Sequence, residues 1–167
     1  MSAIIVYFSR TGENYVSGAI RKLDVGNTEA AAQILQKLTG ADMFKIEPVM
    51  PYSDSYNACI EQAKQDKERN ARPEIVSCPE SLDKYDTIYL GYPNYWGTMP
   101  MCVFTFLEQS DLTGKTIKPF CTHEGSGMGS SESDLKRICR GAEIKKGLPL
   151  HGSRISAAKE AFEKWIK

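Results

Sequence analysis

Hydrophobic and polar positions follow two different periods along the chain. Continuous apolar runs rich in branched and aromatic residues cover Ala3 to Phe8 and Thr87 to Tyr92, which is typical of strands buried on both faces. Another strand is predicted for Thr116 to Thr122, and a short one within Ala142 to Leu150. Met43 to Glu47 alternates apolar and charged residues instead, and this pattern suits a strand at the edge of a sheet.

Segments with helical spacing separate these strands. The predicted helices cover Thr28 to Leu38, Tyr56 to Arg69, Pro100 to Leu107, Ser131 to Cys139, and a last segment from Ile155 to Trp165. Pro100 suits the first position of its helix, and that helix is apolar nearly all round, so we expect it to be deeply packed. Ser131 and Asp134 have the spacing of a capping box.

Strands that alternate with helices predict a parallel sheet with helices on both faces. We expect residues 1–167 to form a single domain of the α/β class, with a doubly wound five-stranded parallel sheet in a three-layer α/β/α arrangement. For such a sheet we expect the spatial order of strands 2-1-3-4-5. Ligands of these sheets bind outside the carboxyl ends of the strands, where the winding reverses. Pro119 removes a ladder N–H from the fourth strand, so a bulge is predicted there.

Composition narrows the class of protein. The formal net charge is zero, whereas a nucleic-acid-binding protein usually has a basic excess. No run approaches the length of a membrane span, and the first apolar run is too short for a signal peptide. The five cysteines include no C-x-x-C pair and there are only two histidines, so no metal site is expected. Reduced thiols in a cytoplasmic protein are the simplest interpretation.

The loop after the first strand looks like a phosphate-binding loop in two halves, SRTG at 9–12 and GNTE at 26–29. Hydroxyl groups and backbone N–H groups at a helix N-terminus hold a phosphate well. The candidate residues are Ser9, Arg10, Thr11, Asn27 and Thr28. Neither the G-x-x-x-x-G-K-[ST] nor the G-x-G-x-x-G motif is present. The alternative is that Asn27 or Thr28 only caps the helix.

Two further loops follow the third and fourth strands. The candidate residues are Pro93, Asn94, Tyr95, Trp96 and Gly97 in the earlier loop, and Thr122, His123, Glu124, Gly125, Ser126 and Gly127 in the later one. Aromatic side chains beside a glycine could bury a flat ring, and a glycine-rich backbone can pass close to a ligand. The alternatives are ordinary packing under the earlier loop and a surface pair of His123 with Glu124. The later loop matches neither G-x-S-x-G nor H-E-x-x-H, and no catalytic residue is assigned.

The segments YFSRTGEN, GNTEAAA, LGYPNYWGTMP and PFCTHEGSGMGSS together resemble the flavodoxins, and specifically a subfamily with a split first loop. The resemblance covers essentially the whole chain and implies a 2-1-3-4-5 sheet with bound FMN. By position, it implies that Ser9, Thr11, Asn27 and Thr28 bind the FMN phosphate. It also implies that Pro93 to Gly97 flank the isoalloxazine, with Tyr95 or Trp96 against the ring and the Gly97 carbonyl near N5, while Thr122 to Gly127 contact the pyrimidine end.

The segment between the two halves, Glu13 to Gly26, has no counterpart in the shorter family loop. Its length is tolerable because loop-closure entropy grows slowly with loop length. We expect this insertion to be a flap near the flavin site, with Tyr15, Val16 and Ile20 as its apolar contacts. The two alternatives are that it covers the cofactor and that it contacts a partner.

The resemblance implies a low-potential one-electron carrier between redox partner proteins, a reductase and an electron acceptor. We expect it to be cytoplasmic, a monomer or weak dimer, and to bind neither nucleic acid nor membrane. Electron-carrying flavodoxins are usually strongly acidic and use that charge to reach partners, which this neutral chain does not match. The alternatives are an FMN-dependent NAD(P)H or quinone oxidoreductase, with space for a second substrate over the flavin, and a flavin-free interaction module.

Overall fold

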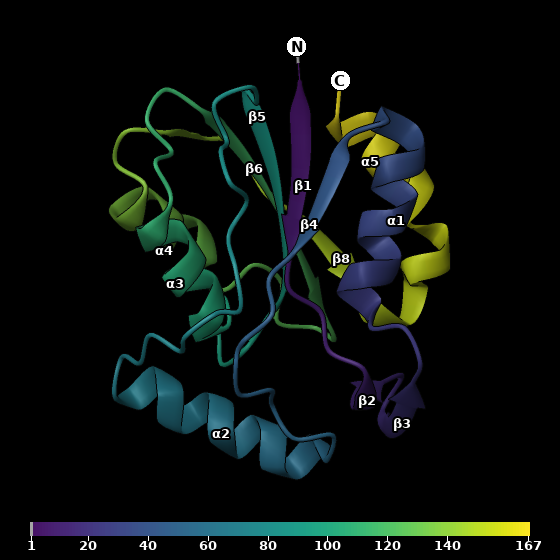
Figure 1. Ribbon diagram of the computed structural model, residues 1–167. Coiled ribbons are helices and arrows are strands. Elements are labelled where there is room, and N and C mark those ends of the chain that lie inside the picture. Colours follow the sequence, from purple (N-terminus) through teal and green to yellow (C-terminus); the bar gives the residue numbers. More distant parts are fainter. Residues whose placement is uncertain (1) are drawn as a thin grey trace.

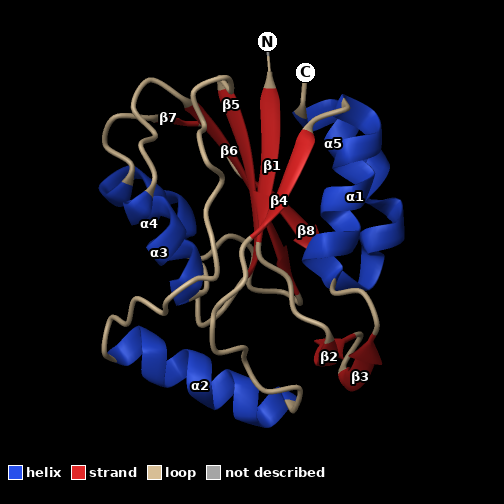
Figure 2. Cartoon of the chain, viewed as in Figure 1, coloured by secondary structure: helices blue, strands red, loops and turns tan. Residues whose placement is uncertain are grey.

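A parallel six-stranded sheet forms the centre of the computed structural model, which describes residues 2–167 (Figures 1 and 2). The strands are, in spatial order, β4 (Asp42–Lys45), β1 (Ala3–Tyr7), β5 (Thr87–Pro93), β6 (Thr116–His123), and an outer position shared by β7 (Glu143–Ile144) and β8 (Leu148–His151). The predicted order 2-1-3-4-5 is confirmed. The fifth strand is split into two short pieces, both paired with β6.

Helices cover both faces of this sheet, which confirms the three-layer prediction (Figure 1). Successive strand residues point to opposite faces. Ile5 and Tyr7 therefore pack in the core beneath α1 (Asn27–Thr39) and α5 (Ala158–Trp165). The other face of β1 packs in the core beneath α3 (Met101–Gln109) and α4 (Ser131–Ile138). The continuous apolar run at the start of the chain follows from burial on both sides.

Two helices show how the pattern of apolar residues determines how deeply a helix is buried. In α3 every residue from Met101 to Leu107 is buried, as predicted, and the helix begins one residue after Pro100. By contrast α2 (Tyr56–Glu68) buries only Cys59 and Ala63. It lies across the carboxyl ends of the strands rather than on a face of the sheet (Figure 1). Within residues 2–167, no helix has both the length and the apolar character that a membrane crossing requires.

The bulge predicted at Pro119 is wrong, because β6 pairs with β5 in an unbroken register that includes Leu90 opposite Pro119. The irregularity is in the neighbouring outer strand instead, which is divided into β7 and β8. The Ile117 carbonyl accepts a hydrogen bond from the Lys145 amide on that side, at 2.9 Å. Alternate residues point the same way, so the missing N–H of Pro119 faces the gap between β7 and β8.

The capping box predicted for Ser131 and Asp134 is also wrong. The N-cap residue of α4 is Ser130, and its side chain makes no capping bond. The Ser131 hydroxyl is buried, donates to the Met128 carbonyl at 2.6 Å and accepts from the Tyr92 hydroxyl at 2.8 Å. The Ser131 hydroxyl is therefore used in hydrogen bonds to Tyr92 of β5 and to Met128, and not in the helix cap that the local spacing predicts.

The last helix begins later than predicted. A 3₁₀ segment, η1 (Gly152–Ala157), precedes α5 and already buries Ile155. Ala158 and Phe162 are buried on α5 itself, and Trp165 packs against the same core cluster. The apolar face is therefore as predicted, although it is shared between two helical segments.

The insertion forms a two-stranded antiparallel hairpin, β2 (Gly12–Val16) and β3 (Ala19–Leu23), which the sequence analysis did not predict. Ser17 and Gly18 make its two-residue turn, with φ of 54° and 80°. Positive φ at both central positions is the type I′ pattern that suits the twist of a hairpin. The hairpin lies below the carboxyl ends of the strands, beneath α1 (Figure 1).

Replacing Phe162 by alanine should destabilise the fold strongly. Its ring is fully buried and packs edge-on against Phe120 with centroids 5.4 Å apart. Loss of a buried phenylalanine costs about 3–5 kcal/mol. The measurement is urea unfolding followed by circular dichroism. Lys159→Ala, an exposed change on the same helix, should cost less than about 0.5 kcal/mol, and equal effects of the two changes would contradict this packing.

Candidate functional site

A cleft of about 360 Å³ opens at the carboxyl ends of β1 and β5, where the winding of the sheet reverses. Its lining residues are Ser9, Arg10, Asn14, Tyr15, Asn27, Thr28, Tyr56, Pro93, Asn94, Tyr95, Thr122, His123, Glu124 and Ser126. The volume is in the range of small-molecule sites. A larger hollow of about 580 Å³ lies between residues 48–52 and α2, apart from these strand ends.

The two halves of the first loop meet in space. The Glu29 amide, in the first turn of α1, donates to Ser9 Oγ at 3.0 Å. Gly26 is the N-cap residue of α1, and a Cβ there would lie 2.2 Å from Ser9 Oγ and 2.5 Å from the Arg10 carbonyl. Asn27 therefore begins the helix rather than capping it, and the alternative that it or Thr28 only caps the helix is wrong. Ser9 supplies a capping oxygen from the other half of the loop.

Thr28 and Asn27 connect the helix start to the rest of the cleft. Thr28 is only 2% exposed, and its hydroxyl is 2.8 Å from that of Thr122 at the end of β6. The Asn27 side chain packs against Gly152, where a Cβ would lie 2.7 Å from Asn27 Nδ2. The amides of Asn27 and Thr28 belong to the first turn, where helices leave N–H groups without an intrahelical acceptor. This end of the cleft is therefore rich in hydrogen-bond donors.

Arg10 and Thr11 differ in position from the other candidates of this loop. The Arg10 guanidinium donates to the Ser53 carbonyl from two nitrogens, at 2.7 and 3.0 Å, and also to the Glu13 carbonyl. Its side chain lines the cleft, but its donors are used to hold the hairpin base against the β4–α2 connection. Thr11 is exposed and lines an adjoining hollow instead of the cleft.

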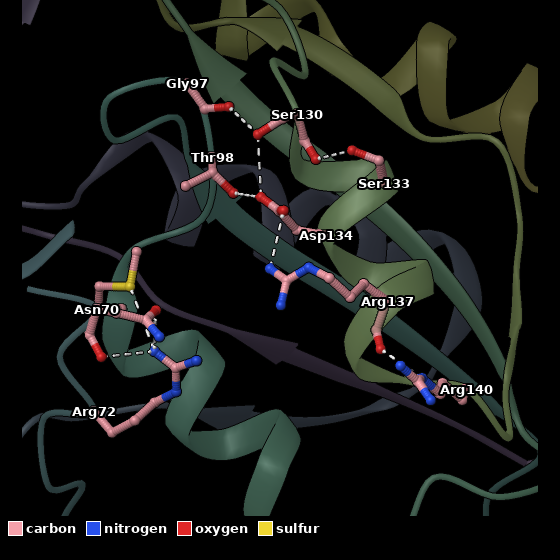
Figure 3. Close-up of polar contacts among 10 residues, drawn as sticks. Asn70, Arg72, Gly97, Thr98, Ser130, Ser133, Asp134, Arg137 and Arg140 are labelled. Atoms are coloured by element: carbon pink, nitrogen blue, oxygen red, sulfur yellow. Dashed lines mark hydrogen bonds and ion pairs between the residues drawn. The ribbon is translucent and has the colours of Figure 1, made fainter. Parts of the chain in front are cut away.

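The second loop makes a tight turn that is fastened to the third loop. Trp96 and Gly97 both have positive φ, at 55° and 87°, and glycine adopts such a conformation readily. Asn94 Nδ2 donates to the Gly127 carbonyl at 2.9 Å, and the Gly97 amide donates to Asn94 Oδ1 at 2.8 Å. The Gly97 carbonyl accepts from the Ser130 amide at 2.7 Å and from the Ser130 hydroxyl at 3.2 Å (Figure 3). These bonds hold two walls of the cleft together.

Asp134 adds a second fastening between these loops. It accepts from the Thr98 hydroxyl at 2.5 Å, and the same carboxylate oxygen lies 3.1 Å from Ser130 Oγ (Figure 3). Arg137, one turn further along α4, donates to its other oxygen at 3.2 Å. The carboxylate thus joins the turn after β5 to the start of α4.

The two aromatic residues of the second loop point in different directions. Tyr95 is half-buried, lines the cleft and packs edge-on against Tyr52 with ring centroids 5.7 Å apart. Desolvation of its hydroxyl raises its pKa strongly, so the hydroxyl stays protonated. The indole N–H of Trp96 donates to the Ile60 carbonyl of α2 at 2.8 Å, and 46% of the residue is exposed. Trp96 and Gly97 are not among the residues that line the cleft.

In the third loop, Thr122, His123, Glu124 and Ser126 line the cleft, whereas Gly125 and Gly127 do not. His123 Nδ1 accepts from the Gly125 amide at 2.8 Å. Burial lowers the pKa of His123 and the nearby His151 lowers it further, while Glu124 opposes them. The neutral ring therefore suits its hydrogen bond. The alternative, a surface pair of His123 with Glu124, is wrong, because the Glu124 carboxylate lies 2.9 Å from His151 Nδ1.

Two residues of the cleft were not predicted from the sequence. Asn14 comes from the hairpin, and its side-chain amide donates to the Arg10 carbonyl at 3.1 Å. Tyr56, the first residue of α2, has a ring centroid 6.0 Å from that of Tyr15. An aromatic residue at a helix start was the available signal for Tyr56. Its approach to the cleft depends on where α2 crosses the strand ends, and the helical pattern carries no such information.

The fold and cleft define a class, a doubly wound α/β protein whose ligand site lies at the switch point of the sheet. A flavodoxin family model matches residues 20–167. The chain belongs to the flavodoxin family, and the resemblance in sequence is thereby confirmed.

Individual relatives agree with this assignment. Flavodoxin 1 of Escherichia coli (strain K12) is 26% identical over 160 residues, covering 86% of this chain and 73% of that protein. A solved protein from Bacteroides eggerthii superimposes with a TM-score of 0.74 at 29% identity, over 97% of this chain and 98% of the other. A flavoprotein from Lactobacillus acidophilus, solved in complex with FMN, has a TM-score of 0.71 at 18% identity over 99% of each chain, a likeness of fold.

Replacing Gly26 by alanine should separate the halves of the first loop. The added methyl group would overlap Ser9 Oγ and the backbone of Arg10. Overpacking of this kind costs about 1–3 kcal/mol in unfolding free energy. Hydrogen exchange of the Glu29 amide should also accelerate, as its bond to Ser9 weakens. Gln33→Ala, at an exposed position of α1, serves as the control. An unchanged Glu29 amide in Gly26→Ala would contradict the close contact.

Proposed function

We propose that this protein binds FMN in the cleft and carries single electrons between redox proteins. Membership of the flavodoxin family and the FMN complex of a structural neighbour support FMN as the cofactor. The observation that carries the proposal is the joined first loop, in which Ser9 and Gly26 bring the N-terminus of α1 to the floor of a cleft at the switch point. Such helix ends bind phosphate through backbone N–H groups and the helix dipole.

The donors at this end of the cleft fit a phosphate group. The proposed ligands are Ser9, Arg10, Thr11, Asn27 and Thr28. Asn27 and Thr28 are the strongest candidates, because they begin the helix and line the cleft. Arg10 already donates to the carbonyls of Ser53 and Glu13, so neutral groups would do most of the binding. Thr11 faces the adjoining hollow and is the weakest candidate.

The flavin ring is assigned to the part of the cleft between the second and third loops. When bound, FMN supplies the redox chemistry, and the protein supplies orientation and electrostatics. The proposed contacts are Pro93, Asn94, Tyr95, Trp96 and Gly97 on one side, and Thr122, His123, Glu124, Gly125, Ser126 and Gly127 at the pyrimidine end. A role for the Gly97 carbonyl beside the ring requires it to leave the Ser130 amide.

Electron transfer to other proteins needs no catalytic side chain, because the cofactor itself accepts and releases the electrons. The proposed partners are a reductase and an electron acceptor. We propose that the protein works in the cytoplasm, which agrees with its five free thiols, as a monomer or weak dimer. Its zero net charge means that local charge rather than a strong overall field must guide these encounters.

Binding of FMN and the phosphate assignment can be tested together by titrating the purified apoprotein into FMN and following quenching of flavin fluorescence. Asn27→Ala should weaken binding about tenfold or more, since hydrogen bonds to a charged group are worth about 1.5–3 kcal/mol. Gln33→Ala on the exposed face of α1 should bind like the wild type. Equal affinity of both variants would remove Asn27 from the site, and a wild type that gains no FMN would overturn the cofactor assignment.

The carrier role is tested by an anaerobic redox titration of the FMN-loaded protein. A one-electron carrier should be reduced in two separate one-electron steps, with the second at low potential. In stopped-flow mixing with NADPH and a quinone it should show almost no turnover. Rapid turnover with these two substrates would instead establish the alternative, an FMN-dependent NAD(P)H or quinone oxidoreductase on the same fold.

A further inference from the structure

The hairpin that interrupts the first loop is fixed to opposite sides of the cleft. At its turn, the Ser17 amide donates to Glu124 Oε1 at 2.8 Å and lies 3.1 Å from Ser153 Oγ. At its base, the Glu13 amide donates to the Asp54 carbonyl at 2.9 Å. A two-stranded hairpin alone is marginally stable in water, so these outside contacts determine where its residues lie.

The base has a second fastening that involves α2. Glu13 Oε1 accepts from the Tyr56 amide at 2.9 Å, at the start of that helix. Arg10 holds the same corner through the carbonyls of Ser53 and Glu13. The strand between the two ends, which carries Tyr15, is therefore held beside the cleft in one position.

Tyr15 presents an aromatic surface in this position. Its ring lines the cleft and lies next to that of Tyr56, with centroids 6.0 Å apart and planes at 34°. Yet 43% of Tyr15 is exposed, so the pair does not bury the ring fully. An aromatic ring is stabilised by an offset-stacked or edge-to-face ring partner, and tyrosine suits a position where its ring is covered and its hydroxyl stays in water.

The aromatic residues of the other loops do not occupy the part of the cleft beside Tyr15. The indole of Trp96 is bonded to α2 and does not line the cleft. Tyr95 is held edge-on by Phe8 and Tyr52, and its hydroxyl is 3.7 Å from Cys59 Sγ. Residues 122–130 contain no phenylalanine, tyrosine or tryptophan. Tyr15 is thus the exposed aromatic residue among those that line the cleft, and it comes from the insertion.

We propose that Tyr15, supported by Tyr56, covers the exposed face of the bound isoalloxazine ring and is a flavin-contacting residue. This inference rests on the proposed binding of FMN. It gives the inserted hairpin a function in the site, because the hairpin strand that interrupts the phosphate loop also carries the aromatic side chain that covers the flavin. Tyr15 also limits the room left over the flavin for a second small substrate, which favours electron transfer between proteins.

The test compares FMN binding by the full-length wild type, Tyr15→Ala, Tyr15→Phe and Ile20→Ala. Ile20 is the cross-strand partner of Tyr15 and is 46% exposed, but it does not line the cleft, so it controls for damage to the hairpin. Tyr15→Ala should weaken FMN binding about tenfold, because aromatic stacking adds to the loss of buried area. Tyr15→Phe should keep most of the affinity, and Ile20→Ala should bind like the wild type.

Fluorescence of the bound flavin separates direct contact from a structural effect. A phenol ring in contact with a flavin quenches its emission by electron transfer, whereas phenylalanine does not. Tyr56 and Tyr95 are the same in all these proteins, so a rise in the emission of bound FMN in both Tyr15→Phe and Tyr15→Ala over the wild type is expected and reports the loss of the Tyr15 phenol. Emission and affinity unchanged in both, with a wild type that binds FMN, would overturn the Tyr15 contact and leave the proposed function intact. A wild type that binds no FMN would overturn both.

Discussion

The hydrogen bond from the Glu29 amide to Ser9 Oγ, packed against Gly26, holds the functional end of this molecule together. It joins the exit of β1 to the entrance of α1 across an inserted hairpin. Closing a loop of this length costs little more entropy than closing a short one, so one capping bond and one glycine contact can maintain it. Because α1 begins there, the direction of its N–H groups and the floor of the cleft depend on the same contact.

Polar contacts between loops hold the remaining walls, in addition to the packing of Tyr95 against Phe8 and Tyr52. Asn94 joins the second loop to Gly127, the Gly97 carbonyl joins it to Ser130, and Thr28 meets Thr122. Within residues 2–167, no buried side-chain nitrogen or oxygen lacks a hydrogen-bond partner. Fully satisfied networks of this kind specify one arrangement, which suits a site that must hold a cofactor in a fixed position.

The insertion changes the character of the cleft. A shorter loop would connect the phosphate site directly, whereas here the chain leaves it, forms β2 and β3, and returns with Tyr15 at the cleft. The type I′ turn at Ser17 ends beside Glu124, so the carboxylate of the third loop fixes the tip of the hairpin. The inserted hairpin thus accounts for two features of the proposed site: the phosphate loop is divided into two halves, and Tyr15 is placed at the cleft.

The sequence by itself determined the order of the central-sheet strands and their helices, the three layers and the three loops. It did so because burial on both faces imposes a continuous apolar run and parallel strands bring their carboxyl ends together. Tertiary structure alone decided the partners of polar side chains. Ser131 turned to Tyr92 instead of capping α4, and Pro119 met a gap in the outer strand instead of a bulge. It also turned Trp96 towards α2 and placed Tyr56 beside Tyr15 at the cleft. Side-chain partners depend on distances between segments remote in sequence, and local spacing does not record those distances.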